Sequence, residues 1–436
     1  MEWRTEELGG SRRAEPPSLR RVLGLLEVTA GGVGIIIGAG IYVLLGAATA
    51  EAGSLVWVAF LGAATLSALT GLSYAELSSM FPSAAGEYEY TRHALPEWLA
   101  FVVGWTMIVG LVVAAATVSI GFARYVGYFI DVDIRLGSIA LLVIASAVAM
   151  VGIKESARLT VGLSAVQVGG LVFVAAIGLP HVGEVDLLSG PGLGGVLAGA
   201  ALVFFAFIGF DEVITLAEET RDPRRTVPRA LLLALALSTA LYVTVAIAAV
   251  SVLGASALAA SSRPLADVMA HVLGDRGATV VAAIAVLTTT NTTLLALTAA
   301  SRVMYGMAKA DAMPHSFAVV HPERQTPIRA ILAVTGLAIM FAGFGEFKLI
   351  AAVTDFAVYV VFLAVNGTVI ILRRTHPDAP RPFAVGGTVR GVPVLPILGL
   401  VSVALMMTQL DSLAIMAGSA ACAVGLAAGW LVRSRQ

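Results

Sequence analysis

The chain has 436 residues, of which 58% are hydrophobic and only 13% are charged, and its formal net charge is -1. A mean hydropathy of +0.92 excludes an ordinary water-soluble globular protein, so most of the chain must lie in a membrane. The single cysteine, Cys422, excludes an internal disulfide framework and a cysteine-based metal site.

Residues 1–20 are polar and rich in arginine and glutamate, which predicts a disordered cytoplasmic tail. We expect residues 21–436 to form one transmembrane domain, because no later polar stretch is long enough to bury a core of its own. The apolar residues fall into twelve stretches of roughly the 17–25 residues that a helix needs to cross a bilayer. These stretches are 27–48, 54–79, 98–127, 136–152, 159–179, 195–217, 229–253, 277–304, 328–343, 349–372, 393–409 and 413–432. Continuous apolar runs favour helices over a transmembrane barrel, whose strands alternate.

Basic residues mark one side of this predicted membrane domain. Most of the 27 lysines and arginines fall on the side of the two termini, and Arg135, Arg263, Arg276 and Lys348 fall on the other. Arg-rich and Lys-rich loops stay in the cytoplasm. We therefore expect a multi-pass protein of the cytoplasmic (cell) membrane with both termini in the cytoplasm.

Two of the twelve stretches are interrupted by glycine. The first contains G-G-V-G-I-I-I-G-A-G (31–40), and the sixth reads A-L-V-F-F-A-F-I-G-F-D-E-V, with Gly209 followed by two acids. Matching breaks in two halves of a transporter point to a binding site at the membrane midplane. Amides freed at the first break suit an anion, and carbonyls freed at the second suit a cation. Close helix packing by Gly34 and Gly38 is the alternative explanation.

Five motifs follow one another along almost the whole chain. They are G-V-G-I-I-I-G-A-G-I-Y-V-L-L-G (32–46), F-P-S-A-A-G-E-Y-E-Y-T-R-H-A-L-P-E-W-L-A-F-V-V-G-W (81–105), F-F-A-F-I-G-F-D-E-V with E-E-T-R-D-P-R-R-T-V-P-R-A (204–230), S-R-V-M-Y-G-M-A-K-A-D-A-M-P (301–314) and Q-T-P (325–327). In content and order they resemble the motifs of amino acid permeases of the amino acid–polyamine–organocation (APC) superfamily. The resemblance implies an all-α polytopic membrane fold with twelve transmembrane helices. Helices 1–5 and 6–10 would form two inverted repeats with helices 1 and 6 broken, and helices 11 and 12 would be peripheral.

The resemblance also implies alternating access around a central site. The α-carboxylate of an amino acid is expected at the amides of the first break, and its α-ammonium at the carbonyls of the second. The predicted substrate-binding residues are Ile37, Gly38, Ala39, Gly40, Phe205, Ala206 and Ile208. Phe205 also falls where the family places an aromatic gate toward the outside. The candidates for the substrate's side-chain pocket, each explained equally well by helix packing, are Ile36, Ile37, Thr106, Met107, Gly110, Phe207 and Phe210.

Few ionisable residues lie inside the apolar stretches, where each is costly unless it is paired or functional. Glu27, Glu76 and Arg124 lie near the ends of their stretches, where structural pairing explains them. Asp211 follows the second break, as either a gating or proton-responsive carboxylate or a cap for the next half-helix. Asp355, in the tenth stretch, needs a partner that the sequence does not name.

Gln167 is the clearest departure from the family pattern. Several proton-coupled relatives carry a lysine at the aligned position of the fifth helix, and a neutral amide cannot supply a titrating charge. A polar stripe in the eighth stretch either hydrogen-bonds between helices or coordinates an ion beside the first break, with Thr290 and Asn291 as the candidate coupling residues. The stripe consists of Thr289, Thr290, Asn291, Thr292 and Thr293. We expect no cofactor. Coupling to protons or sodium stays open, with exchange, uniport or a carboxylate relay through Asp211 as the choices.

We therefore expect a secondary transporter of amino acids, and of neutral ones, because no carboxylate is clearly placed to meet a second positive charge. A polyamine or cationic amino acid permease or exchanger is the closest alternative, and a non-transporting substrate sensor is another. An enzyme is not expected, because the six histidines lie outside the stretches or at their ends. The expected partners are a small-molecule amino acid and the lipid bilayer, with no nucleic acid; the oligomeric state is not predicted.

Overall fold

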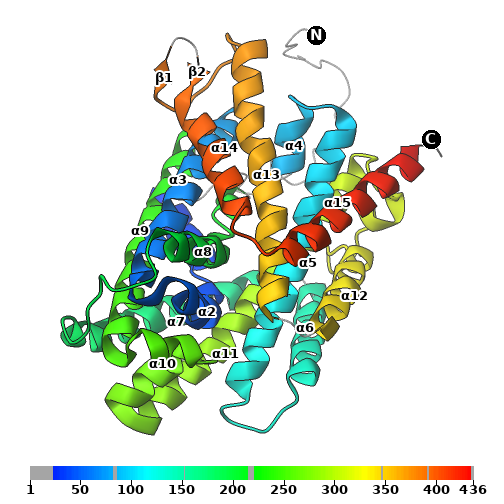
Figure 1. Cartoon of the computed structure of the whole chain (residues 1–436). Helices are drawn as coiled ribbons and strands as arrows, with labels where there is room; N and C mark the ends of the chain where they lie inside the picture. The colour runs from blue at the N-terminus through cyan, green and yellow to red at the C-terminus, as the bar shows by residue number, and fades with distance from the viewer. Residues whose placement is uncertain are drawn as a thin grey trace.

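The computed structural model describes residues 23–81, 86–151, 153–214, 220–344, 347–389 and 392–433, and these are almost entirely α-helical (Figure 1). The predicted tail, residues 1–20, lies outside the described residues. The helices up to the middle of the chain are α1 (Leu25–Ile36), α2 (Gly40–Ala52), α3 (Val56–Met80), α4 (Gly86–Arg92), α5 (Glu97–Val126), α6 (Ile134–Val151) and α7 (Ile153–Gly178). Short 3-10 turns, η1 (Gly53–Leu55) and η2 (Leu179–His181), follow α2 and α7.

The second half begins with α8 (Leu193–Val203), which continues into the 3-10 turn η3 (Phe204–Phe207). The helices after it are α9 (Pro223–Leu253), α10 (Ala255–Ala260), α11 (Pro264–Lys309), α12 (Ile328–Phe344), α13 (Phe347–Thr375), α14 (Val394–Met407) and α15 (Ser412–Arg433). A 3-10 turn, η5 (His315–Ala318), precedes α12. Two short strands, β1 (Thr388–Val389) and β2 (Val392–Pro393), pair antiparallel beyond the end of α13.

Each of the twelve predicted stretches falls on helical segments, so the prediction of an all-α polytopic membrane protein is confirmed. By length and composition, eight helices of the described chain are able to cross a membrane, or nine if the pair α14 and α15, bent by 118°, forms one span. The number is below twelve because α2 and α3 count together as one helix of 41 residues, α12 has only 17 residues, and α14 and α15 form the bent pair. The full count of twelve and the inverted repeats stay predictions.

Helix α5 occupies the centre of the bundle. It packs against α11, α13, α6 and α15, and 89% of its most apolar window is buried. Helices α1 and α2 pack on α9 and α8 respectively, which brings the first and sixth stretches together. Because α5 is central, one of its faces is available to line any space between the first and sixth stretches.

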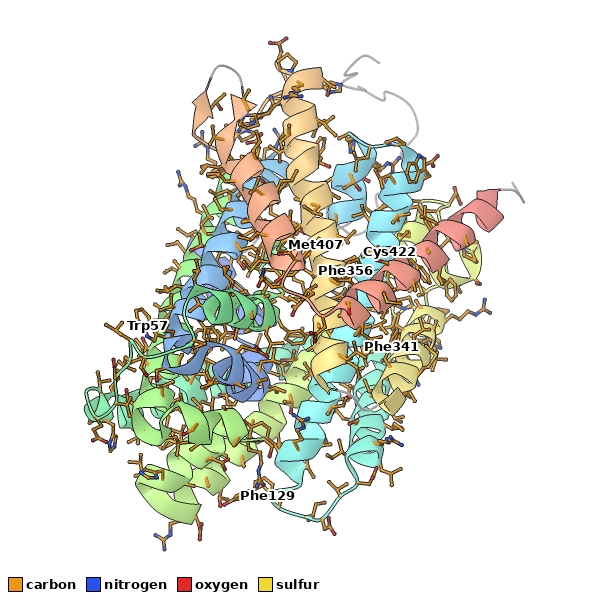
Figure 2. All side chains as sticks on the ribbon, in the orientation of Figure 1. Trp57, Phe129, Phe341, Phe356, Met407 and Cys422 are labelled. Atoms are coloured by element: carbon orange, nitrogen blue, oxygen red, sulfur yellow. The ribbon has the colours of Figure 1, made fainter. Side chains whose placement is uncertain are left out.

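Burial is inverted relative to a soluble protein. Large apolar side chains such as Leu136 and Met416 are 67% exposed on the outside, whereas polar side chains such as Gln167 and Asn291 are fully buried. Outer apolar faces suit lipid, and inner polar groups find partners on other helices. Figure 2 shows Cys422 where α15 crosses in front of α5, and its Sγ lies 3.4 Å from the Thr106 hydroxyl. Cys422 therefore has a packing role.

Candidate functional site

The first break separates α1 from α2 at residues 37–39. The Ile37 amide still donates to Val33 O at 2.8 Å, but the Ala39 amide leaves the helix and donates to the Thr292 hydroxyl of α11 at 3.0 Å. Helix α2 restarts at Gly40, so the amides of its first turn have no carbonyl within the helix to accept them. Such an N-terminus carries a partial positive charge and is suited to an anion.

The second break comprises residues 204–210, where α8 gives way to η3 and then to a turn. Gly209 has φ +110°, a conformation that L side chains rarely adopt, so the turn requires glycine at this point. The carbonyl ends of this segment carry partial negative charge, because the helix that would bind them has ended.

The two breaks contact each other directly. A Cβ added at Gly40 would lie 2.5 Å from Ala206 Cα, so only glycine allows this approach. The Tyr242 hydroxyl of α9 lies 2.8 Å from Ile36 O and 2.9 Å from Ala206 O, and is thus a donor shared by both breaks. Tyr242 is fully buried and holds the two unwound segments side by side.

A cavity lies between the breaks, α5 and α11, and the space in it that a water molecule could occupy is about 50 Å³. Its walls combine backbone from both breaks with mostly apolar side chains. The lining residues are Ile35, Ile36, Gly38, Ala39, Gly40, Leu111, Ala114, Val118, Phe205, Ala206, Ile208, Gly209, Glu212, Thr292, Leu295 and Ala296.

The structure brings six of the seven predicted substrate-binding residues together on this wall. They are Gly38, Ala39, Gly40, Phe205, Ala206 and Ile208. The seventh, Ile37, is buried (1% exposed) and does not line the cavity. Phe205, also predicted as the gate, is 6% exposed and faces the cavity, so its ring is next to whatever the cavity holds.

The candidates for the side-chain pocket divide differently. Ile36 lines the cavity, but Ile37, Thr106, Met107, Gly110, Phe207 and Phe210 do not. Gly110 faces α13, where an added Cβ would lie 3.2 Å from Ala357 Cβ. The wall of α5 is formed instead by Leu111, Ala114 and Val118, which share one helix face, and α11 adds Leu295 and Ala296. The resulting side-chain region is apolar.

Gln167 bridges helices beside the first break. Its amide nitrogen donates to Gly34 O at 2.6 Å, and its amide oxygen lies 3.4 Å from Asn291 Nδ2. Thr290 turns back on its own helix and donates to Val286 O. The polar stripe therefore reaches the first break through Thr292, a member of the stripe that was not among the predicted coupling residues, and reaches Gln167 through Asn291.

Asp211 and Glu212, the two acids after the second break, lie in different surroundings. Asp211 is buried, does not line the cavity, and accepts a hydrogen bond from the Gly209 amide at 3.1 Å. Glu212 lines the cavity. Of the other intramembrane groups, Glu76 is bound by Arg373 and Arg381, which agrees with a pairing role. Both carboxyl oxygens of Asp355 are buried without a hydrogen-bond partner in the described chain.

Comparison with known proteins identifies relatives over most of this architecture. A family model described as "Amino acid permease" matches residues 23–419. A branched-chain amino acid permease of Bacillus subtilis is 33% identical over 408 residues, covering 88% of this chain and 86% of the relative. An uncharacterized transporter of Mycobacterium tuberculosis is 32% identical over 418 residues, covering 95% and 91%. A cationic amino acid transporter of Homo sapiens is 30% identical over 396 residues, covering 84% and 62%.

Proposed function

Because the chain belongs to the amino acid permease family and is an amino acid transporter of the membrane, we propose that its cavity selects neutral amino acids with apolar side chains. The observation that carries the proposal is the composition of the cavity wall, backbone at one side and apolar side chains at the other. Transport would proceed by alternating access across the cytoplasmic membrane, with both termini in the cytoplasm.

The backbone of the two breaks would bind the part that all amino acids share. The substrate carboxylate would meet the amides of Gly38, Ala39 and Gly40. It would compete with Ile36 O for the Gly38 amide and with the Thr292 hydroxyl for the Ala39 amide. The ammonium would meet the carbonyls of the second break, beside the Phe205 ring. Opposite charges at the two ends of one small molecule match opposite partial charges at the two breaks.

The apolar wall would read the substrate side chain. Leu111, Ala114 and Val118 of α5 offer no charge or hydroxyl, so they favour hydrocarbon over polar groups. Leucine has three more carbons than alanine, and burial contributes about 0.8 kcal/mol for each, or about 2.4 kcal/mol in all. The expected preference for leucine over alanine is therefore roughly 50-fold in affinity. The name of the Bacillus subtilis relative supports the same substrate class.

A cationic amino acid is the second candidate, because Glu212 lines the cavity. A carboxylate there is able to meet a second positive charge, and a human relative is named for cationic substrates. The apolar wall of α5 and α11 surrounds most of the cavity, whereas Glu212 is a single group next to the second break. For this reason we rank the neutral substrate first.

A ligand panel on purified protein tests this proposal. Thermal-shift screening of the twenty amino acids and polyamines selects ligands, and uptake into proteoliposomes then establishes flux under proton and sodium gradients. Leucine, isoleucine or valine should displace labelled substrate best. Better displacement by arginine or lysine would overturn the neutral assignment, and Glu212→Gln should then remove that preference. Binding without any flux would favour the substrate-sensor alternative.

A further inference from the structure

Helix α4 is a short helix whose side chains are almost all buried. It lies at the same end of the molecule as β1 and β2, opposite α10 (Figure 1). Glu87 and Tyr88 are 5% exposed, and Tyr90 and Thr91 are fully buried. This end carries Arg92, Arg373 and Arg381, as the predicted cytoplasmic side requires. A charged side chain buried in so short a helix calls for a physical reason.

Aromatic rings attach α4 to the second break. The Tyr74 ring of α3 lies at the centre, 6.4 Å from Tyr90 of α4, 5.6 Å from Phe210 of the break and 5.7 Å from Phe362 of α13. All three contacts are edge-on, the favoured geometry for aromatic pairs. Movement of α4 away from the bundle would therefore separate Tyr90 from Tyr74, the ring that links α4 to the second break.

Two carboxyl groups face each other within this cluster. Tyr74 Oη donates to Glu87 Oε1 at 2.9 Å, and the carboxyl groups of Glu87 and Asp211 lie within hydrogen-bonding reach of one another. Asp211 in turn accepts the Gly209 amide. Two buried carboxylates in contact cannot both be ionised without strong repulsion, so the pair needs one proton.

The described ion pairs leave this pair uncompensated. Glu89, on the same helix, pairs with Arg92 and His93, whereas Glu76 is bound by two arginines. In the described chain no basic side chain forms an ion pair with Glu87 or Asp211. Burial, with the facing Asp211 carboxylate second, raises the pKa of Glu87 to about 7. A proton at this position therefore exchanges within the physiological range.

We propose that Glu87 and Asp211 share one proton that holds α4 on the second break, and that release of this proton to the cytoplasm accompanies opening of the cavity to that side. The step is a proton transfer from a carboxyl group to water, which leaves two carboxylates that repel each other and push α4 outward. This inference rests on the alternating access of the proposed function and supplies it with a coupling ion.

The other groups around the pair fit this role. Tyr74 on α3 donates to Glu87, and Tyr90 and Glu89 are the further titratable groups on α4 near it. On the cavity side, Glu212 adjoins the pair, and Arg302 of α11 is the cation whose field acts on Glu212. Helix α13 contributes the uncharged Phe362. Glu212 thus provides a carboxyl neighbour through which the cavity communicates with the pair.

Three single variants test the proposal in the full-length protein. Glu87→Gln keeps an acceptor for Tyr74 and a donor for Asp211, and so imitates the permanently protonated pair. Asp211→Asn neutralises the other member if the first variant fails to fold. Glu89→Gln is the matched control, because it removes a carboxylate from the same helix at a position already paired with Arg92.

Exchange of labelled leucine, or of the best ligand of the panel, is measured in proteoliposomes with the same pH on both sides, so protein orientation does not matter. A group with a pKa of about 7 is about 10% ionised at pH 6 and about 90% ionised at pH 8. Wild type and Glu89→Gln should therefore speed up about ninefold over this range. Glu87→Gln and Asp211→Asn should show no such rise. A rise retained in Glu87→Gln would overturn the proposal.

Infrared titration of the purified protein gives a readout that needs no transport. A protonated carboxyl band should disappear between pH 6 and pH 8 in the wild type, with a midpoint near 7, and should be absent in Glu87→Gln. If the band is present and pH-dependent but no amino acid is transported, the proposed function fails while the shared proton stands. If the band is identical in wild type and Glu87→Gln, the shared proton is refuted.

Discussion

Replacing Gly40 by alanine tests whether contact between the two breaks creates the binding site. The added Cβ would lie 2.5 Å from Ala206 Cα, 2.7 Å from Ala206 Cβ and 3.1 Å from Ala206 N. Carbon atoms pack at about 3.5–4.0 Å, so the two segments must separate by roughly 1 Å. Two of the three close atoms belong to the backbone of Ala206, which cannot rotate away as a flexible side chain does.

Overpacking of this kind costs about 1–3 kcal/mol. If separating the two segments destabilises the substrate-bound state by this amount, substrate affinity should decrease roughly 5-fold to 150-fold, because about 1.4 kcal/mol corresponds to a factor of ten. The assay is ligand displacement on purified protein, accompanied by the thermal unfolding midpoint. Loss of affinity should exceed any loss of thermal stability, because the contact lies at the cavity rather than in the outer bundle.

Gly169→Ala on α7 is the matched control. Its added Cβ would meet nothing within 4 Å, and alanine favours a helix over glycine by roughly 0.5–1 kcal/mol. Affinity should be unchanged and stability the same or higher. If Gly40→Ala bound substrate with wild-type affinity, the breaks would not form the site, and the reasoning from their contact would be refuted.

Three further substitutions probe groups that support the site. Tyr242→Phe removes the donor shared by Ile36 O and Ala206 O and should lower the free energy of unfolding by about 1–3 kcal/mol, because both acceptors are buried. The unfolding midpoint should fall and substrate binding should weaken. Unchanged values would mean that the hydroxyl does not hold the breaks together. Gln167→Lys places an ammonium where the amide now contacts Gly34 O and Asn291, neither of which is a carboxylate. Transport should therefore acquire a new pH dependence. An unchanged pH profile in the uptake assay would show that this position is not the coupling site. Glu76→Gln leaves Arg373 and Arg381 without their buried carboxylate and should destabilise the protein by about 3–5 kcal/mol. The unfolding midpoint measures this loss. If the midpoint fell no further than in Glu89→Gln, a structural role for the ion pairs of Glu76 would be contradicted.

The breaks could be predicted from the sequence because their cause is local. Gly209 adopts φ +110° and Gly40 meets Ala206 Cα, and both positions require glycine for reasons that belong to the backbone. The apolar stretches are equally local, since length and hydropathy decide whether a segment belongs in a bilayer. Six of the seven predicted binding residues consequently line one cavity.

The side-chain pocket could not be predicted because it depends on helix rotation. The sequence suggested Thr106, Met107 and Gly110, yet Gly110 faces α13 and the cavity begins at Leu111. Almost every face of α5 is buried, so no polar face indicates which side meets the cavity. Only the packing of α11 and α13 on either side decides it.

Contacts between distant residues could not be predicted either, because they too depend on how the helices pack. Tyr242 reaches both breaks from α9, Thr292 reaches Ala39 across 253 positions, and Glu87 meets Asp211 from a helix outside the apolar stretches. No pattern in the sequence pairs any of these residues with its distant partner. Glu87 lies in the motif 81–105 that carries part of the family resemblance, and that motif does not show that Glu87 is buried beside Asp211.

The charges around the cavity indicate where a driving force can act. The two breaks offer opposite partial charges that a neutral amino acid satisfies without net change, and Gln167 fills the place beside the first break with an uncharged amide. Nothing in that part of the site gains or loses a charge when the substrate leaves. Three other buried acids remain. Asp355 lies within α13 and has no hydrogen-bond partner among the described residues, whereas Glu87 and Asp211 form a pair that contacts both the second break and α4. A proton gradient drives transport only if some group binds its proton more tightly in one conformation than in the other. The Glu87–Asp211 pair meets this condition, because its surroundings must change when the cavity opens to the cytoplasm. Substrate binding and proton coupling would then be separate functions that meet at Gly209, which lines the cavity and whose amide donates to Asp211.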